Sequence, residues 1–226
     1  RDSEKIRILR EEFAKVPCLY VADGHHRSAS ATRVAQARRK ANPDHTGEEA
    51  WNFFLVVIFP DDQMKILDYN RVVFDLNGLS PEELLEKVAE KFTVATTDEA
   101  KPSRPRDYGM RLGDTWYRLT AKPGTFPEDD PVKSLDIAVL QDNLLAPLLG
   151  IEDPRTDKRI DFVGGIRGMK ELEKRVAEGA AVAFALYPTG IDQLMAIADA
   201  GEVMPPKSTW FEPKLRSGLF VRPLDD

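Results

Sequence analysis

The sequence contains few of the residues that mark redox, zinc-binding and disulfide-rich proteins. Among its 226 residues there is one cysteine, Cys18, and there are three histidines. A single cysteine excludes an intrachain disulfide framework and a cysteine-based zinc cluster. The surrounding segment, KVPCLYV, favours an inert thiol that is buried in a strand. The sequence therefore predicts neither redox catalysis nor a structural zinc site.

Long apolar runs are also scarce, and the 32 basic residues are outnumbered by 38 acidic ones. No window approaches the roughly 18 uninterrupted apolar residues of a membrane span, and residues 1–13 lack the apolar centre of a signal peptide. The net charge of −6 repels polyanions, although the basic stripe at residues 38–40 could bind one locally. These features predict a cytoplasmic protein without a membrane partner and make nucleic acid an unfavoured one. They leave the oligomeric state open.

Hydrophobic periodicity predicts a mixed α/β (α+β) chain. Helices are expected over residues 3–15, 28–40, 81–92, 134–150, 168–178 and 191–201. Strands are expected over residues 19–22 and 51–59, within 64–74, in a hairpin over 108–122, and over 159–163 and 180–188. Residues 98–107 are charged and rich in proline, as is typical of a linker. We expect the internal domain boundary there.

Residues 20–28, YVADGHHRS, contain two of the three histidines between an expected strand and an expected helix. A strand that turns into a helix leaves the first backbone N–H groups of that helix unpaired, and the helix dipole attracts anions to them. Gly24 lets the backbone approach a ligand, and His26 and Arg27 add donors beside it. Together with Ser28, these residues predict a phosphate-binding site.

Asp23 lies at the edge of this turn, where it could hold Mg²⁺ or accept a proton. The alternative is structural: Asp23 caps the helix, Gly24 makes the turn, and the histidines are polar side chains whose hydrogen bonds are satisfied. A metal centre built on His25 and His26 is disfavoured because adjacent side chains point in different directions and no third ligand lies at a suitable spacing.

The segment MPPKSTWFEPKLRSGLF is a second candidate, in which prolines stiffen a loop around two aromatic residues. It could close over a bound phosphate or amino acid. The candidate substrate contacts are Lys207, Ser208, Thr209, Lys214 and Arg216. The alternative is that Trp210 and Phe211 pack onto the second lobe and leave these polar groups in solvent.

A polar group also accompanies the expected strand at residues 51–59. It consists of Asp61, Asp62, Asn70 and Arg71. These residues could hold a cation, but side chains of this kind more often form the turn of a hairpin.

The segment YVADGHHRSASA resembles the Gly-x-His-Arg box of the ParB/sulfiredoxin superfamily, in which the turn and the following helix bind nucleotide phosphates. Together with FPDDQMKILDYNRVV, GDTWYRL, DPRTDKRIDFVGG and the segment MPPKSTWFEPKLRSGLF, it resembles a large uncharacterised prokaryotic family labelled ParB-like or SpoOJ-like. The resemblance implies that residues 1–97 form the C-terminal part of a ParB/sulfiredoxin-like nucleotide-binding lobe. Residues 98–226 then form a second α/β lobe. Members are longer at the N-terminus, and because this chain begins at Arg1, we expect it to lack that part.

Free serine kinases are the characterised members of the superfamily most similar in this box. The resemblance implies an ATP- or ADP-dependent, Mg²⁺-assisted phosphotransferase acting on a small hydroxylated metabolite, with conversion of free L-serine to O-phosphoserine favoured. Asp23, His25 and His26 would be catalytic, and the general base would be a Glu upstream of this sequence. Sulfiredoxin chemistry is disfavoured because that enzyme has a Cys at the position of His25. A non-catalytic nucleotide sensor or ParB-like regulatory protein remains the alternative.

Overall fold

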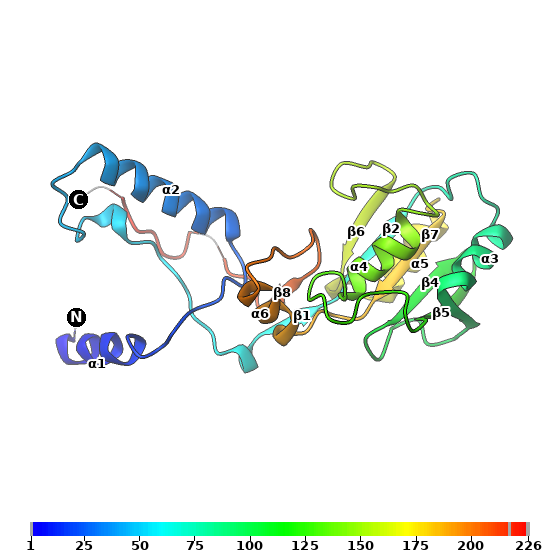
Figure 1. Cartoon of the computed structure of the whole chain (residues 1–226), viewed down its shortest axis with the longest axis horizontal. Coiled ribbons are helices and arrows are strands. Elements are labelled where there is room, and N and C mark those ends of the chain that lie inside the picture. Colours follow the sequence, from blue (N-terminus) through cyan, green and yellow to red (C-terminus); the bar gives the residue numbers. More distant parts are fainter. Residues whose placement is uncertain (1, 217, 225–226) are drawn as a thin grey trace. The chain divides into compact units, whose positions relative to one another are not determined.

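The computed structural model describes residues 2–216 and 218–224, and the chain divides into two compact units (Figure 1). The first unit consists of Arg1–Phe59 and Lys214–Asp226, and the second of Pro60–Pro213. The sequence predicts an internal boundary at residues 98–107. The six-stranded sheet of the second unit takes strands from both sides of that position.

The first unit is built from helices and extended segments. It contains α1 (Ser3–Phe13), α2 (His25–Ala41) and the 3₁₀ turn η1 (Ala50–Asn52). The Asp2 carboxylate accepts a hydrogen bond from the backbone N–H of Lys5 (3.2 Å) and so caps α1. The helices expected over residues 3–15 and 28–40 are confirmed, with shifted ends.

The strands expected in the first unit do not form. Residues 16–24 and 53–59 belong to no helix or strand, and the side chains of residues 53–58 are 44–54% exposed. A strand needs a neighbour that pairs with its backbone groups, and none of the described residues in this unit provides one. The prediction of a buried thiol is wrong for the same reason, because Cys18 lies in this extended region and is exposed.

The second unit is built on an antiparallel sheet with strand order β3-β5-β4-β7-β2-β6. The strands are β2 (Tyr69–Val73), β3 (Phe92–Thr96), β4 (Asp107–Leu112), β5 (Thr115–Ala121), β6 (Ile160–Gly164) and β7 (Val182–Leu186). A separate two-stranded ribbon pairs β1 (Lys65–Leu67) with β8 (Trp210–Glu212). Two short 3₁₀ turns, η2 (Asp61–Gln63) and η4 (Gly165–Arg167), precede β1 and α5.

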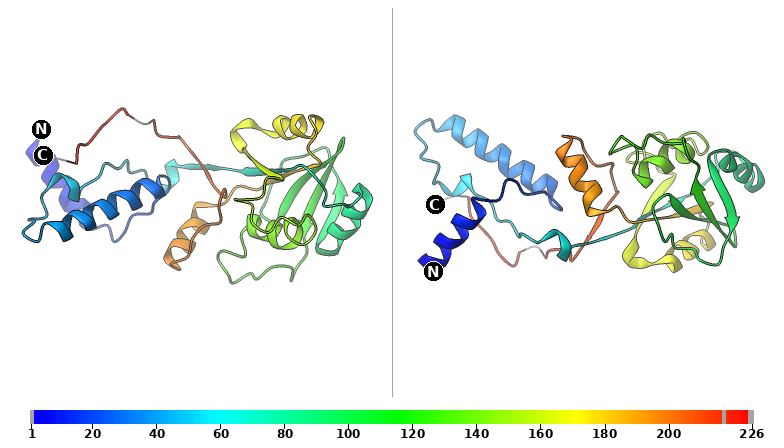
Figure 2. Two further views of the ribbon diagram at one scale, coloured as in Figure 1. Left: turned by 90° about the horizontal axis from the view of Figure 1, so that it is seen from above. Right: turned by 60° about the horizontal axis from the view of Figure 1, so that its bottom comes forward.

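Helices cover both faces of this sheet (Figure 2). They are α3 (Pro81–Lys91), α4 (Asp136–Leu140) with its π-helical continuation η3 (Gln141–Leu145), and α5 (Met169–Ala177). The last helix of the unit, α6 (Ile191–Asp199), follows β7 in the chain. One face packs against α3 and α4, and the other packs Trp116 and Val163 against Leu172 of α5. Every residue of β7 is buried, as expected for a strand inside a sheet that is covered on both sides. The predicted mixed α/β (α+β) fold class is confirmed.

Most local predictions for the second unit also agree with the structure. The hairpin turns at Gly113-Asp114, and Ser80 and Glu83 form the predicted capping box of α3. The helix expected over residues 134–150 begins later, because α4 follows Leu135 and then widens into the π-helical turn. Strand β8 was not expected. None of the helices formed by the described residues is long and apolar enough to cross a membrane.

The capping box provides a test of the second unit's stability. The Ser80 Oγ accepts from the Glu83 N–H (3.2 Å), so Ser80→Ala should lower the free energy of unfolding by about 1 kcal/mol. The control is Ser103→Ala, which changes an exposed serine with no hydrogen bond to any described residue. Urea unfolding monitored by tryptophan fluorescence measures both variants. An equal cost for the two would contradict the capping assignment.

Candidate phosphate-binding site

Helix α2 begins without a side-chain cap. Its N-cap residue is Gly24, whose backbone has the left-handed angles φ 84° and ψ 29°. The Asp23 Oδ1 accepts from the N–H of Gly24 (2.9 Å), outside the first turn of the helix. The structural alternative, in which Asp23 caps the helix, is therefore wrong, and the first turn keeps its own donors.

The first three backbone N–H groups of α2 have no acceptor among residues 2–216 and 218–224. The first helical hydrogen bond runs from the Ser28 N–H to the Gly24 carbonyl (2.9 Å). The described part of the chain contains no acceptor for the N–H groups of residues 25–27. Because the positive end of the helix dipole adds to these donors, the turn favours an anion such as phosphate.

The side chain of Arg27 lies over Gly24. A Cβ atom at position 24 would come within 2.9 Å of Arg27 Nη2 and 3.0 Å of its Nε. Position 24 therefore requires glycine for two reasons. Its backbone is left-handed, and a Cβ atom there would overlap the space that the Arg27 guanidinium occupies. Arg27 is exposed and forms no ion pair with any residue that the structure describes, so its planar donors can contact an anion.

Lys214 adds a second cation to the turn from a distant part of the sequence. Its Nζ lies 3.5 Å from the Asp23 Oδ2, and the two side chains are 42% and 43% exposed. The two residues are 191 positions apart. An ion pair this exposed contributes little to stability, and the Lys214 ammonium remains accessible from solvent.

The remaining residues of the box surround the same helix start. His25 and His26 are exposed on the first turn of α2, and Ser28 is half-buried. Asp23 is the carboxylate of the turn. The described residues contain no group of three or more metal-ligating side chains. The expectation that Asp23 holds Mg²⁺ stays a prediction.

The candidate substrate residues are divided between the units. Lys214 and Arg216 belong to the first unit, and Lys207, Ser208 and Thr209 belong to the second. Arg216 and Lys207 are exposed, Thr209 is half-buried, and the buried Ser208 donates its hydroxyl to the Pro205 carbonyl (2.7 Å). Of these five, Lys214 has a described contact with Asp23. Asp23 belongs to the turn formed by residues 23–27, which we call the DGHHR turn.

The packing alternative for the loop aromatics agrees with the structure. Phe211 is 2% exposed and pairs with Ile66 in the β1–β8 ribbon. The ring of Trp210 lies so close to Gly164 that a Cβ atom there would meet it at 2.5 Å. These two side chains anchor the segment to the second unit, while Lys207 stays in solvent.

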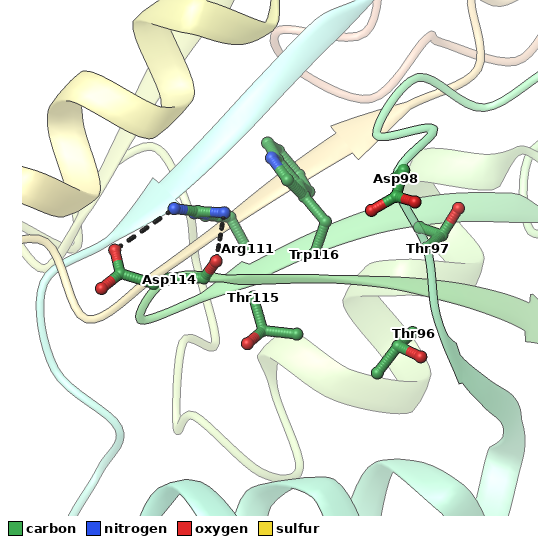
Figure 3. A pocket seen from close by; sticks show the side chains of 7 residues that line it. All are labelled: Thr96, Thr97, Asp98, Arg111, Asp114, Thr115 and Trp116. Carbon is green, nitrogen blue, oxygen red and sulfur yellow. Dashed lines mark hydrogen bonds and ion pairs between the residues drawn. The ribbon is translucent and has the colours of Figure 1, made fainter.

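The second unit contains a pocket of about 310 Å³ that the sequence does not predict (Figure 3). Its lining residues are Thr96, Thr97, Asp98, Arg111, Asp114, Thr115 and Trp116. Arg111 donates from Nη1 to the Asp114 carbonyl (2.7 Å), and its Nε is buried with no partner among the described residues. From the sequence, only the hairpin is predicted at these residues. The pocket forms because the end of β3 lies beside that hairpin in the folded sheet, and the sequence does not show this pairing.

Replacing Gly24 tests the geometry of the turn. Gly24→Ala should displace Arg27 and weaken the binding of inorganic phosphate by about tenfold, as expected for the loss of one charge-assisted contact. The matched control is Gly47→Ala, because Gly47 has a similar φ of 93° but no atom near its missing Cβ. Both variants should lose about 1 kcal/mol of stability. Equal phosphate affinity in the two, measured by calorimetry, would rule out a role for Arg27.

Comparisons with known proteins place the chain in a family. None of the curated proteins matches it. Among solved structures, a free serine kinase in complex with AMP aligns with a TM-score of 0.47 and 15% identity, covering 87% of this chain and 70% of that one. A mutant free serine kinase in complex with AMP gives 0.45 and 14%, covering 93% and 80%. A conserved hypothetical protein from Pyrococcus furiosus gives 0.43 and 14%, covering 87% and 72%. The family model described as "Protein of unknown function (DUF1015)" matches residues 1–138, more than half of the chain, and the chain therefore belongs to this family.

Proposed function

We propose that the DGHHR turn binds the phosphates of ATP or ADP and that the protein transfers a phosphoryl group to a small hydroxylated metabolite. One observation carries the proposal. Three N–H groups with no acceptor among the described residues and the guanidinium of Arg27 lie in one turn, and the ammonium of Lys214 contacts it. A single helix start would suit any small anion, whereas two additional cations suit the higher charge of a nucleotide di- or triphosphate.

The proposed step is an in-line displacement at the terminal phosphorus of the nucleotide. The acceptor's hydroxyl oxygen forms a bond to this phosphorus while the bond from phosphorus to the bridging oxygen of the leaving nucleotide breaks. The acceptor's proton passes to a base, for which Asp23, His25 and His26 are the titratable groups of the turn. The N–H groups, Arg27 and Lys214 balance the charge on the phosphoryl oxygens. Mg²⁺, when bound with the nucleotide, supplies further charge neutralisation, and Asp23 is its proposed protein ligand.

Free L-serine is the proposed acceptor. Support comes from the resemblance of the ADGHHR box to that of free serine kinases and from the polar residues Lys207–Thr209. Lys207 offers an exposed cation, which suits the carboxylate of an amino acid. A nucleotide sensor without turnover would use the same phosphate contacts and would need no acceptor.

Nucleotide affinity tests the phosphate contacts. Arg27→Ala and Lys214→Ala should each weaken ADP binding by about tenfold, because each removes a charged contact to phosphate. Arg33→Ala is the control, since Arg33 is an exposed cation of α2 that lies beyond its first turn. Calorimetric titration of the full-length protein with ADP provides the measurement. Affinities that fall equally in all three variants would indicate only a general effect of charge and would contradict the assigned site.

Product analysis separates the kinase from the sensor. Full-length protein incubated with ATP or ADP, Mg²⁺ and a panel of hydroxylated amino acids should yield O-phosphoserine that ³¹P NMR detects. The Arg27→Ala variant should yield it more slowly at subsaturating nucleotide. Nucleotide binding without a phosphorylated product across the panel would contradict the kinase and support the sensor.

A further inference from the structure

The pocket of the second unit lies where the edge strand β3 ends beside the β4–β5 hairpin (Figure 3). Strand β3 pairs with β5 as far as Thr96 and Tyr117, and the Thr97 N–H then donates to the Trp116 carbonyl (3.0 Å). Beyond this bond, no described strand pairs with Thr115 on that side. All seven lining residues belong to the second unit. The volume of about 310 Å³ is at the small end of the roughly 300–1,000 Å³ of ligand pockets, so the pocket suits a small metabolite.

Arg111 supplies the positive charge of this pocket. Its side chain is 17% exposed, and its guanidinium uses two of five N–H donors on Asp114. Nη1 donates to the Asp114 carbonyl (2.7 Å) and Nη2 to the Asp114 Oδ1 (3.3 Å). The Asp114 side chain is fully exposed, so water screens the ion pair. The other three donors, Nε among them, have no acceptor in the described chain, and such a guanidinium favours a carboxylate.

Trp116 holds the Arg111 guanidinium in place. The two residues are directly opposite each other on β5 and β4, and the guanidinium carbon lies 5.9 Å from the centre of the indole ring. The ring is itself fixed by α5, because its Nε1 donates to the Glu173 Oε1 (3.0 Å) and Leu172 packs in the same cluster. This wall of the pocket is therefore formed before a ligand binds, which reduces the conformational entropy lost on binding.

Asp98 supplies a carboxylate that is free to bind a cation. It is exposed just after β3, and it forms no hydrogen bond or ion pair with residues 2–216 or 218–224. Figure 3 shows Asp98 and Arg111 on either side of Trp116. The hydroxyls of Thr96 and Thr115 also line the pocket, form no hydrogen bond with a described residue, and can donate or accept. The pocket thus offers donors for an anionic group and a carboxylate for a cationic one.

A lining with both signs of charge selects among classes of ligand. A simple anion would meet the carboxylates of Asp98 and Asp114, and a simple cation would meet the guanidinium of Arg111. A neutral polyol would leave these charges without ionic partners. A zwitterion avoids all three costs, because its carboxylate pairs with the guanidinium and its ammonium pairs with Asp98.

We propose that this pocket binds a small zwitterionic amino acid, with its carboxylate on Arg111 and its ammonium on Asp98. α-Amino acids and ω-amino acids share this chemistry and differ in the distance between their two charges. The site goes beyond the proposed function, because none of its lining residues belongs to the DGHHR turn. Binding here requires neither nucleotide nor turnover, so the proposal can be tested whether or not the protein is a kinase.

Titration of the ¹⁵N-labelled full-length protein with charged and half-charged ligands tests the site. Glycine or 4-aminobutyrate should shift the Arg111 Nε–H signal and the backbone amides of Thr97 and Asp98, with a Kd below about 1 mM. The single-charge analogues are acetate and methylamine for glycine, and butyrate and butylamine for 4-aminobutyrate. Each should bind at least about tenfold more weakly than its zwitterion, because it lacks one charged contact.

The two zwitterions distinguish the source of the ligand. Tighter binding of glycine indicates an α-amino acid, and tighter binding of 4-aminobutyrate indicates an ω-amino acid. If neither zwitterion shifts these signals at about 10 mM, ten times the expected upper limit of Kd, the proposal is overturned. Equal affinity of a zwitterion and its single-charge analogues would overturn it as well.

Replacing the arginine tests the contact with the carboxylate. Arg111→Met should weaken binding of the preferred zwitterion by about tenfold and leave the affinity for its amine analogue nearly unchanged. The matched control is Arg175→Met. Arg175 is 23% exposed, pairs with Asp161 and lies 5.9 Å from the centre of the Phe74 ring, outside the pocket. An equal loss of affinity in both variants would contradict the role of Arg111.

Replacing the aspartate tests the contact with the ammonium and does not depend on a buried side chain. Asp98→Asn should also weaken binding of the zwitterion by about tenfold, and it should then bind the zwitterion no more tightly than the carboxylate analogue. The control is Asp129→Asn, which changes an exposed carboxylate without a hydrogen bond to a described residue. Zwitterion affinity that is the same in Asp98→Asn, Asp129→Asn and the unaltered protein would overturn the proposal.

Discussion

Gly24 begins α2 in a backbone conformation that leaves the first turn of the helix without a cap. Most helices satisfy their first N–H groups with a Ser, Thr, Asp or Asn side chain, and α1 and α3 of this protein do so. In α2 the nearby carboxylate of Asp23 bonds to Gly24 instead, and the guanidinium of Arg27 occupies the space above it. The uncapped donors reduce the stability of the helix. We propose that these donors form a preorganised site for phosphate oxygens, and the proposed function depends on it.

The two units use arginine in different ways. In the first unit, Arg27 is exposed and lies beside unpaired donors, as a ligand-binding cation should. In the second, Arg71 is buried, and its hydrogen bonds to described residues run to the backbone carbonyls of Tyr69 and Lys207. The lysines follow the same division, since Lys214 contacts the turn while Lys207 is held by β2. Exposure and hydrogen-bond partners thus distinguish two environments that the residue type alone does not.

Local sequence signals predicted the elements whose causes are local. The capping box at Ser80 and the glycine-containing hairpin turn at Gly113 depend on neighbouring residues and appear as expected. The strand predicted from the apolar run at residues 51–59 does not form. A strand needs a neighbouring strand to pair with, and the run itself does not specify that neighbour. For the candidate site, the sequence identified the DGHHR turn. Lys214 contacts Asp23 across 191 positions of sequence, and Arg71 contacts Lys207 across 136. Sequence patterns that depend on residue spacing within one element do not predict contacts between residues so far apart.

Chemical-shift mapping of the helix start tests the central claim most directly. Titration of ¹⁵N-labelled protein with ADP should shift the backbone amide signals of His25, His26 and Arg27 most strongly, because their N–H groups would bond to phosphate oxygens. Signals from the middle of α2 should move much less. If ADP saturates the protein while these three amide signals stay in place, the nucleotide binds elsewhere, and the account of the DGHHR turn is contradicted.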